Sequence, residues 1–200
     1  NLNPKLPLFI FIGRLVGEKA ADLLPKAISD SLGQVGNKMN FLILGSGDKK
    51  VEAQLTHLTN NFTGYYNSKI GYNEKLSHQM YAGADFILMP SRVEPCGLNQ
   101  MYALRYGTIP IVRSTGGLKD TVIDFGESAE NLKRAVGQGL GIRFNNASVW
   151  DITYSVHRAV ELYDDKEKMT EIRNQVMGID NSWETSAGKY IALYNAAQSK

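Results

Sequence analysis

Short runs of consecutive apolar residues recur along the chain, and most of them stop at glycine, serine or proline. The runs cover residues 8–12, 41–44, 85–89 and 109–112, with a weaker example at 141–144. Continuous apolar runs of this length are typical of strands that are covered on both faces, as in a parallel sheet. Residues 61–66 are a candidate for another short strand.

Between these runs the apolar residues change to a helical spacing. Apolar residues recur every three or four positions over residues 21–32, 51–58, 76–84 and 98–105. Alternation of strands and helices predicts an α/β fold with a mostly parallel sheet and helices on both faces. Right-handed crossovers then bring the carboxyl ends of the strands to one edge, where open α/β sheets bind ligands.

The last fifty residues have a different pattern, which predicts three helices over 148–162, 167–176 and 183–197. Ser148 is the expected N-cap of the first helix, and Asp151 follows it as in a capping box. We expect Trp150 and Trp183 to anchor the core. We interpret residues 1–200 as one Rossmann-like domain with a C-terminal helical segment over about 148–200.

Composition narrows the class of protein. The 200 residues include 43% apolar residues, which is enough for a sizeable core, and 22 basic against 20 acidic residues, a net charge of +2. This balance argues against a disordered tail and against a nucleic-acid-binding protein that neutralises many phosphates. The single cysteine excludes an intrachain disulfide framework and a cysteine-based zinc cluster. No apolar stretch approaches the length of a membrane span, so we expect no membrane partner.

The first candidate site is the segment 13–19, Gly-Arg-Leu-Val-Gly-Glu-Lys, between the first strand and the first helix. Gly13 permits a tight turn or the close approach of a ligand. Arg14 and Lys19 lie near a helix N-terminus, where basic groups and free amides together form an anion site. The alternative is a pair of solvated charges on a surface loop.

The second candidate is the segment 91–99 after the third strong strand. Glu94 precedes a helix expected to start near Gly97, and its carboxylate could accept hydrogen bonds from sugar hydroxyls. The alternative is a carboxylate that only stabilises the helix dipole. Cys96 is either a packed small residue or, next to a helix N-terminus, a reactive thiol.

Three weaker signals also follow predicted strands. Gly45-Ser46-Gly47 lacks the third glycine of a dinucleotide-binding fingerprint, because Lys50 stands in that position, so NAD or FAD binding is disfavoured. It is either a tight turn or a nucleotide contact. Tyr72 could stack on a base. Paired glycines in the segment 115–117 could present backbone amides to a phosphate.

Together these segments resemble the bacterial glycogen synthase and plant starch synthase family. The resemblance spans nearly the whole chain, and its most specific strings are P-S-R-V-E-P-C-G-L at 90–98 and T-G-G-L-K-D-T-V at 115–122. It also includes G-R-L-V-G-E-K at 13–19, G-S-G-D at 45–48, I-G-Y at 70–72 and Y-G-T-I-P at 106–110.

The resemblance implies the C-terminal, donor-binding half of a GT-B glycosyltransferase. It implies transfer of glucose from ADP-glucose to the non-reducing end of an α-1,4-glucan, with retention at the anomeric carbon. Arg14 and Lys19 match the family's diphosphate-binding pair, and Glu94 matches the carboxylate that holds the donor glucose; these are the expected catalytic residues. The residues that match its nucleotide-sugar contacts are Gly13, Ser46, Tyr72, Cys96, Gly97, Leu98, Asn99, Thr115, Gly116 and Gly117.

The resemblance further implies a bacterial cytoplasmic enzyme, less readily a plastid one, that needs no metal or other cofactor. The family's N-terminal acceptor domain is not in this sequence, so we expect nucleotide binding without transfer by this chain alone. The last helix would cross back toward that domain, and we expect its apolar face to be partly exposed. Two positions depart from the family pattern, since Ala20 replaces a glycine and Asn99 a threonine.

Two alternatives remain open. The chain could be the donor domain of another GT-B transferase that uses a UDP- or GDP-sugar, and base preference would distinguish that case. It could also be a nucleotide-binding module without catalysis. Tyr102 stands where related retaining transferases carry a second glutamate, which weakens the UDP-sugar reading.

Overall fold

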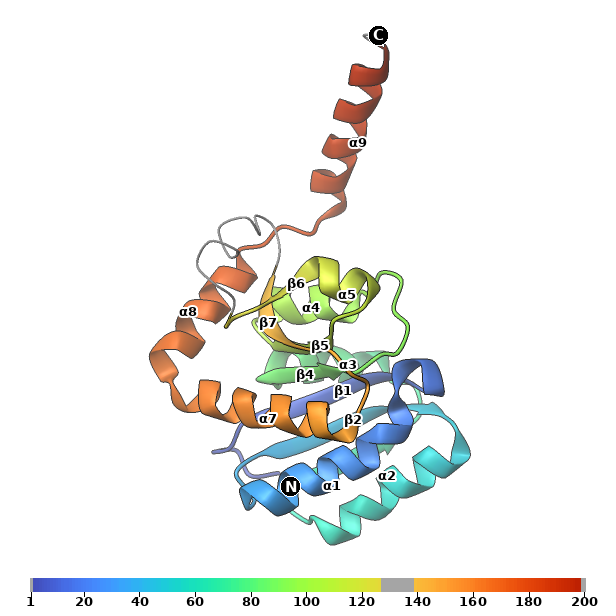
Figure 1. Ribbon diagram of the computed structural model, residues 1–200, viewed down its shortest axis with the longest axis vertical. Coiled ribbons are helices and arrows are strands. Elements are labelled where there is room, and N and C mark those ends of the chain that lie inside the picture. Colours follow the sequence, from blue (N-terminus) through green and yellow to red (C-terminus); the bar gives the residue numbers. More distant parts are fainter. Residues whose placement is uncertain (1, 127–138, 199–200) are drawn as a thin grey trace.

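One parallel sheet forms the centre of the protein. The computed structural model describes residues 2–126 and 139–198, and within them the strands follow the order β3-β2-β1-β4-β5-β7-β6 (Figure 1). The strands are β1 (Leu8–Leu15), β2 (Asn40–Gly47), β3 (Tyr66–Ile70), β4 (Phe86–Met89), β5 (Ile109–Arg113), β6 (Val122–Asp124) and β7 (Gly139–Phe144). The predicted α/β class with a parallel sheet is confirmed.

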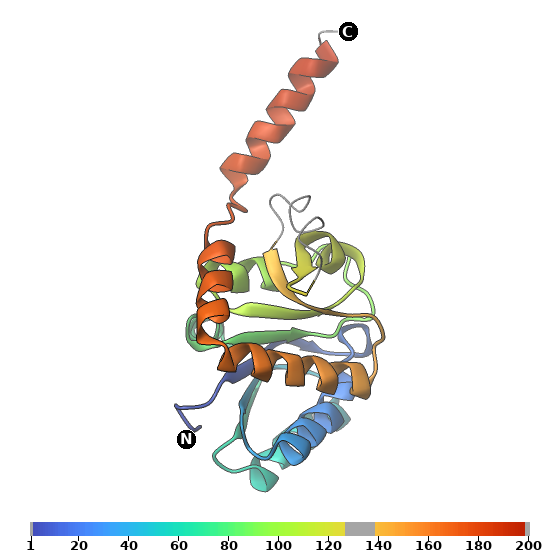
Figure 2. The same cartoon turned by 60° about the vertical axis from the view of Figure 1, so that its left-hand side comes forward.

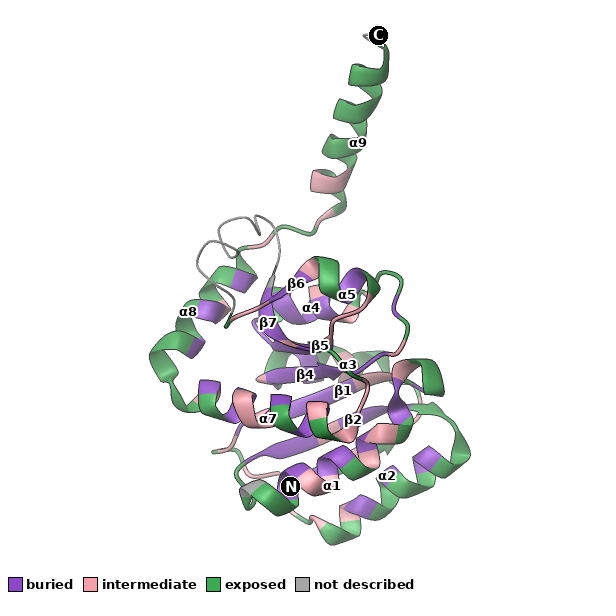
Figure 3. Cartoon of the chain, in the orientation of Figure 1, coloured by how far each residue is buried: buried purple, intermediate pink, exposed green. Residues whose placement is uncertain are grey.

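Helices cover both faces of this sheet and bury two apolar clusters against it. The larger cluster lies under α1 (Leu24–Val35), α2 (Lys49–Asn61), α7 (Val149–Asp164) and α8 (Lys166–Met177). The smaller cluster lies under α3 (Glu74–Gly83), α5 (Gly116–Thr121) and part of α4 (Asn99–Tyr106). The continuous apolar runs are therefore strands that are buried from both sides, as Figure 3 shows.

The strand order creates a switch point at the centre of the sheet. The chain proceeds outward from β1 to β2 and β3 on one side, and β4 and β5 then continue from β1 on the other side. Crevices at the carboxyl ends of such strands are the usual ligand sites of doubly wound folds. The segments that follow β1 and β4 are those that the sequence singled out.

The C-terminal helices follow the predicted pattern. The Ser148 hydroxyl accepts a hydrogen bond from the Asp151 amide (3.0 Å), so Ser148 caps α7 as expected. In contrast, α9 (Trp183–Gln198) extends away from the body of the protein (Figures 1 and 2). Its large apolar side chains are exposed, which agrees with the expectation for the last helix. They include Tyr190, Ile191, Leu193 and Tyr194.

Three local predictions were wrong. Residues 61–66 do not form a strand, because α2 runs to Asn61 and the strand begins only at Tyr66. Trp150 and Trp183 are not core anchors, since they are 70% and 84% exposed. Trp150 stacks instead on the Tyr154 ring at the surface of α7 (5.3 Å between centroids). No helix among the described residues is long and apolar enough to cross a membrane.

Candidate functional site

A hollow of about 530 Å³ opens at the carboxyl edge of the sheet, beside the switch point. It lies between the ends of β1 and β2 and the beginnings of α3 and α4. Predicted site residues on its wall are Gly13, Arg14, Ser46, Tyr72 and Asn99. The fold thus brings together four sequence segments that lie far apart along the chain.

The β1–α1 segment forms one wall. Strand β1 continues through Gly13 and Arg14 to Leu15, and the short 3₁₀ turns 17–19 and 21–23 follow it. Between these turns Ala20 has φ 52° and ψ 31°, which is the left-handed region that favours glycine. The departure from the family pattern at Ala20 therefore falls on a residue that adopts a glycine-like conformation.

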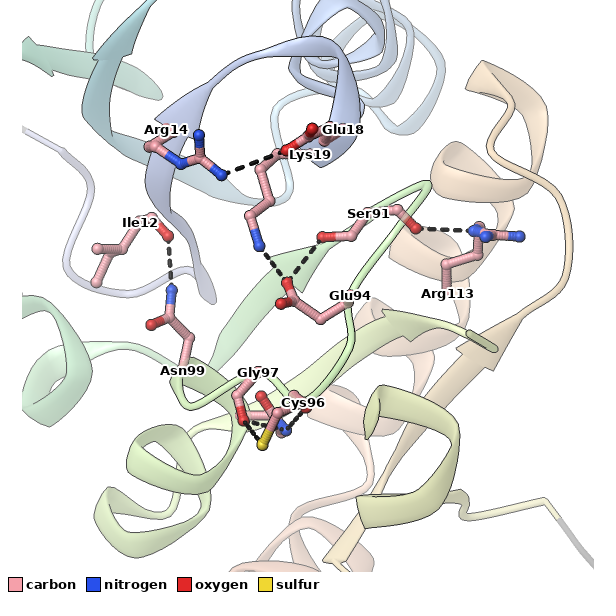
Figure 4. Close-up of polar contacts among 11 residues, drawn as sticks. Ile12, Arg14, Glu18, Lys19, Ser91, Glu94, Cys96, Gly97, Asn99 and Arg113 are labelled. Atoms are coloured by element: carbon pink, nitrogen blue, oxygen red, sulfur yellow. Dashed lines mark hydrogen bonds and ion pairs between the residues drawn. The ribbon is translucent and has the colours of Figure 1, made fainter. Parts of the chain in front are cut away.

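Arg14 stands at the exposed end of β1. Its guanidinium donates to the Glu18 carboxylate (3.3 Å), and Figure 4 shows both residues at the same loop as Lys19. An exposed i,i+4 ion pair stabilises a protein only slightly. The Arg14 guanidinium can therefore exchange Glu18 for a stronger anion at small cost.

The segment 45–47 continues strand β2, so the tight-turn interpretation of its glycines was wrong. Gly45 is packed so closely on β1 that a Cβ atom there would lie 2.1 Å from the Gly13 carbonyl oxygen. Asp48 then caps α2 by accepting hydrogen bonds from the amides of Lys50 (2.8 Å) and Val51 (3.1 Å). Ser46 faces the hollow next to Arg14, its partner in the strand register.

Lys19 and Glu94 lie together beside Arg14, next to the hollow, but neither is among the residues that line it. The Lys19 ammonium forms an ion pair with the Glu94 carboxylate, and the Ser91 hydroxyl donates to the same carboxylate oxygen (3.2 Å) (Figure 4). The side chains of Lys19 and Glu94 are only 24% and 9% exposed. A half-buried ion pair of this kind holds both groups in fixed positions, because separating them would leave a desolvated charge.

The start of α4 forms the floor of the site. The Asn99 side-chain amide donates to the Ile12 carbonyl (2.7 Å), which ties α4 to the end of β1. Gly97 has a φ of 75° at the turn into the helix. Leu98 and Cys96 are exposed, so the packed-residue interpretation of Cys96 was wrong. The buried Gln100 holds residues 96–97 in place, because its side-chain amide donates to the carbonyls of Cys96 (3.1 Å) and Gly97 (2.9 Å).

The glycines after β5 hold the Glu94 segment in place. The Gly117 amide donates to the carbonyl of Glu94 (3.1 Å), and a Cβ at Gly117 would lie 2.1 Å from the Cys96 carbonyl oxygen. Gly116, with a φ of 43°, approaches the Glu94 carbonyl equally closely. The expectation that the Gly117 amide is presented to a phosphate was therefore wrong, because the Glu94 carbonyl accepts the hydrogen bond from this amide. Thr115 precedes α5 as its N-cap residue.

Tyr72 stands at the outer rim of the hollow and is 88% exposed. The adjacent Asn73 caps α3 by accepting from the Leu76 amide (2.9 Å). Sequence reasoning missed the residues of α3 that line this side, which lack a recognisable motif. They are Glu74, Ser77, His78 and Tyr81.

The chemistry of the site follows from its charges. The cations of Arg14 and Lys19 lie at the edge of the sheet with the carboxylates of Glu18 and Glu94. Such a mixture of charges suits a ligand that carries both an anionic group and hydroxyls. Among residues 2–126 and 139–198, no group of three or more His, Cys, Asp or Glu side chains is arranged to hold a metal ion.

Sequence reasoning also missed the residues that join the walls of the site. The Arg92 guanidinium contacts both Asp22 and the Gly17 carbonyl, and Arg113 donates to carbonyls of the segment after β4. The partners lie far apart along the chain, and no spacing in the sequence indicates such pairs.

Comparison with known proteins shows which family the sequence matches. The sequence profile of the family described as "Glycosyl transferases group 1" matches residues 1–138. A glycogen synthase of Flavobacterium johnsoniae is 56% identical over 98% of this chain and 39% of its own length. A glycogen synthase of Rhizobium leguminosarum is 41% identical over 99% of this chain and 40% of its own length.

A solved structure has the same architecture. The catalytic domain of starch synthase IV from Arabidopsis thaliana, bound to ADP and acarbose, superposes with a TM-score of 0.83 at 35% identity. The match covers 98% of this chain and 39% of that one. The chain thus spans about two fifths of the length of the relatives that it matches.

Proposed function

Because the chain belongs to the group 1 glycosyl transferases, we propose that it is the donor-binding half of a retaining α-1,4-glucan synthase that uses ADP-glucose. The observation that carries this proposal is the Lys19–Glu94 pair at the carboxyl edge of β1 and β4. This pair places a cation, which can bind a diphosphate, next to a carboxylate, which can bind the hydroxyls of a sugar.

Arg14 and Lys19 would bind the diphosphate. When the bond between the sugar and the diphosphate breaks, negative charge grows on the leaving oxygens. Fixed cations stabilise that charge more in the transition state than in the ground state, which accelerates the transfer. Two cations could therefore supply the charge that a metal ion supplies in other phosphate chemistries, and we propose that the reaction needs no metal or other cofactor.

Glu94 would bind the donor glucose. Its carboxylate is held in place by Lys19 and Ser91. An ionised carboxylate accepts hydrogen bonds from hydroxyls and favours the positive charge that develops on the sugar ring. We do not assign it as a covalent nucleophile.

The nucleoside would occupy the hollow between β1, β2 and α3. The hollow of about 530 Å³ suits a nucleoside, and Tyr72 and Ser46 lie on its wall. Tyr72 offers an exposed ring on which a base can stack. The ADP in the similar Arabidopsis starch synthase supports the choice of adenine.

The acceptor would bind residues outside this sequence. The chain spans 39% of the Flavobacterium glycogen synthase, so more than half of such a relative lies beyond the segment described here. We therefore expect this chain to bind donor nucleotide and to elongate glucan negligibly by itself. A cytoplasmic location in a bacterium is part of the same proposal, and the bacterial glycogen synthases support it.

Calorimetric titration with ADP, UDP and NAD tests the proposal. We expect selective binding of ADP, weakened about tenfold by Arg14→Ala because one charged contact to the phosphates is lost. The matched control is Lys26→Ala, which removes a similarly exposed cation on α1. A preference for UDP would favour the alternative of a UDP-sugar transferase. A preference for NAD, or unchanged ADP binding by the Arg14 variant, would contradict the proposal.

A further inference from the structure

One arginine joins the two segments that carry the central ion pair. The Arg92 guanidinium, after β4, forms a bidentate pair with the Asp22 carboxylate (2.6 and 2.9 Å). The same guanidinium donates to the Gly17 carbonyl (2.7 Å). The Arg92 amide also donates to the Glu18 carbonyl (2.8 Å). The side chain and backbone of this one residue therefore contact both 3₁₀ turns of the β1–α1 segment.

Arg113, at the end of β5, contacts the segment after β4 that carries Arg92. Its guanidinium donates to the carbonyls of Ser91 (2.8 Å) and Arg92 (2.6 Å), and more weakly to that of Asn145 (3.3 Å). Figure 4 shows Arg113 and Lys19 on opposite sides of the segment that carries Ser91 and Glu94. The backbone around Arg92 is therefore fixed between the β1–α1 segment and the sheet.

The central ion pair lies directly beside this junction. Lys19 precedes Asp22 by three residues, and Glu94 follows Arg92 by two. We infer that Asp22 and Arg92 are a positioning pair, a latch that sets the place of Lys19 relative to Glu94 without touching the ligand. This inference rests on the proposed function, because the position of Lys19 matters only if Lys19 binds the diphosphate of the donor.

The chemistry of the latch requires a guanidinium. A planar guanidinium can bind both oxygens of a carboxylate and still donate to a carbonyl, whereas an ammonium is a single point of charge. The Arg92 and Asp22 side chains are 38% and 47% exposed. Ion pairs at such a surface add little to stability. The effect of breaking the latch is therefore expected in ligand affinity and in the freedom of Lys19 rather than in folding.

Asp22→Asn tests the latch in the full chain. We expect the affinity for ADP to fall about tenfold, while the affinity for adenosine, which has no phosphate, stays unchanged. Arg92→Lys should act in the same direction. The matched control is Asp30→Asn, which makes the same substitution in the Lys26–Asp30 pair on α1 and should leave the ADP affinity unchanged.

A second measurement does not depend on nucleotide. Amine labelling of Lys19 by an activated ester, quantified by mass spectrometry, should accelerate several-fold in Asp22→Asn. In Asp30→Asn only Lys26 should label faster. If Asp22→Asn left both the ADP affinity and the Lys19 labelling unchanged, the latch would be refuted. If the wild-type chain bound no ADP, the proposed function would fail, and labelling of Lys19 would still decide the latch.

Discussion

The two ends of the candidate site are built in different ways. At the inner end, next to the hollow, the largely buried side chains of Lys19 and Glu94 form an ion pair. The segment that carries Glu94 is held there by contacts with Gly17, Arg113 and Gly117. At the outer end, Tyr72 stands almost fully exposed on a single turn before α3. The inner end is therefore built from buried contacts between several segments, whereas the outer end is a single exposed side chain.

This difference separates two kinds of residue. A substitution that displaces the closely packed backbone of the inner end changes both the folding free energy and the geometry of the charged groups, because the same contacts serve both. A substitution at the outer rim changes only the contact with the ligand. Measuring stability and nucleotide affinity on the same variants therefore distinguishes the two ends.

The largest effect is expected from Gly117→Ala at the inner end. The new Cβ would lie 2.1 Å from the Cys96 carbonyl oxygen, so the backbone that carries Glu94 must move. We expect a loss of about 1–3 kcal/mol in the free energy of unfolding and a loss of most ADP affinity. Urea unfolding and calorimetry on the same preparation measure both quantities.

Gly33→Ala is the matched control for that variant. Gly33 lies in α1 with nothing within 4 Å of an added Cβ, so alanine fits without strain. Its higher helix propensity should stabilise the chain by up to about 1 kcal/mol with unchanged ADP affinity. If Gly117→Ala behaved like Gly33→Ala, the close packing of the two segments would have no role in the site.

Tyr72→Ala should show the opposite behaviour at the outer end. The ring is 88% exposed, so the unfolding free energy should stay within about 0.5 kcal/mol of the wild type. Loss of stacking on a base should weaken ADP binding by about 1–3 kcal/mol, while Tyr72→Phe should retain it. A Tyr72→Ala variant that lost stability but bound ADP normally would reverse the comparison.

The smallest effect is expected from acid at the Asp22–Arg92 latch. The hydrogen bond from Arg92 lowers the pKa of Asp22 below its ordinary value of 3.8. A carboxyl group with a lowered pKa in the folded state contributes stability above its unfolded pKa and loses it as the pH falls through the folded pKa. The Tm difference between wild type and Asp22→Asn should therefore be small at pH 6, should shrink as the pH falls below about 4, and should vanish only below the lowered pKa of Asp22 in the folded chain. A difference that grew in acid would contradict the assigned ion pair.

Most of the fold could be predicted from the sequence, because buried parallel strands leave continuous apolar runs and their covering helices leave a 3.6-residue spacing. The errors fall where the pattern does not say what covers an apolar side chain. Trp183 is a large apolar residue of the kind that usually anchors a core, but α9 extends away from the sheet and leaves its side chain exposed. The three-residue strand β6 is too short to produce a pattern.

The site could be predicted only in part. Arg14, Lys19 and Glu94 could be singled out because they follow predicted strands, and the parallel sheet brings such ends to one edge. The Asp22–Arg92 pair could not be found, since its members lie 70 residues apart along the chain. Gly116 and Gly117 could also be singled out, but sequence alone could not show that they pack against the backbone of residues 94–96.

The measurement that tests the central claim most directly is an NMR titration of the labelled chain with ADP, followed through the backbone amides. If the hollow beside the switch point is the donor site, the amide signals of Gly13, Ser46, Tyr72 and Gly97 shift together, with one dissociation constant. Shifts confined to another surface, such as the groove between Phe125 and α7, would contradict the account.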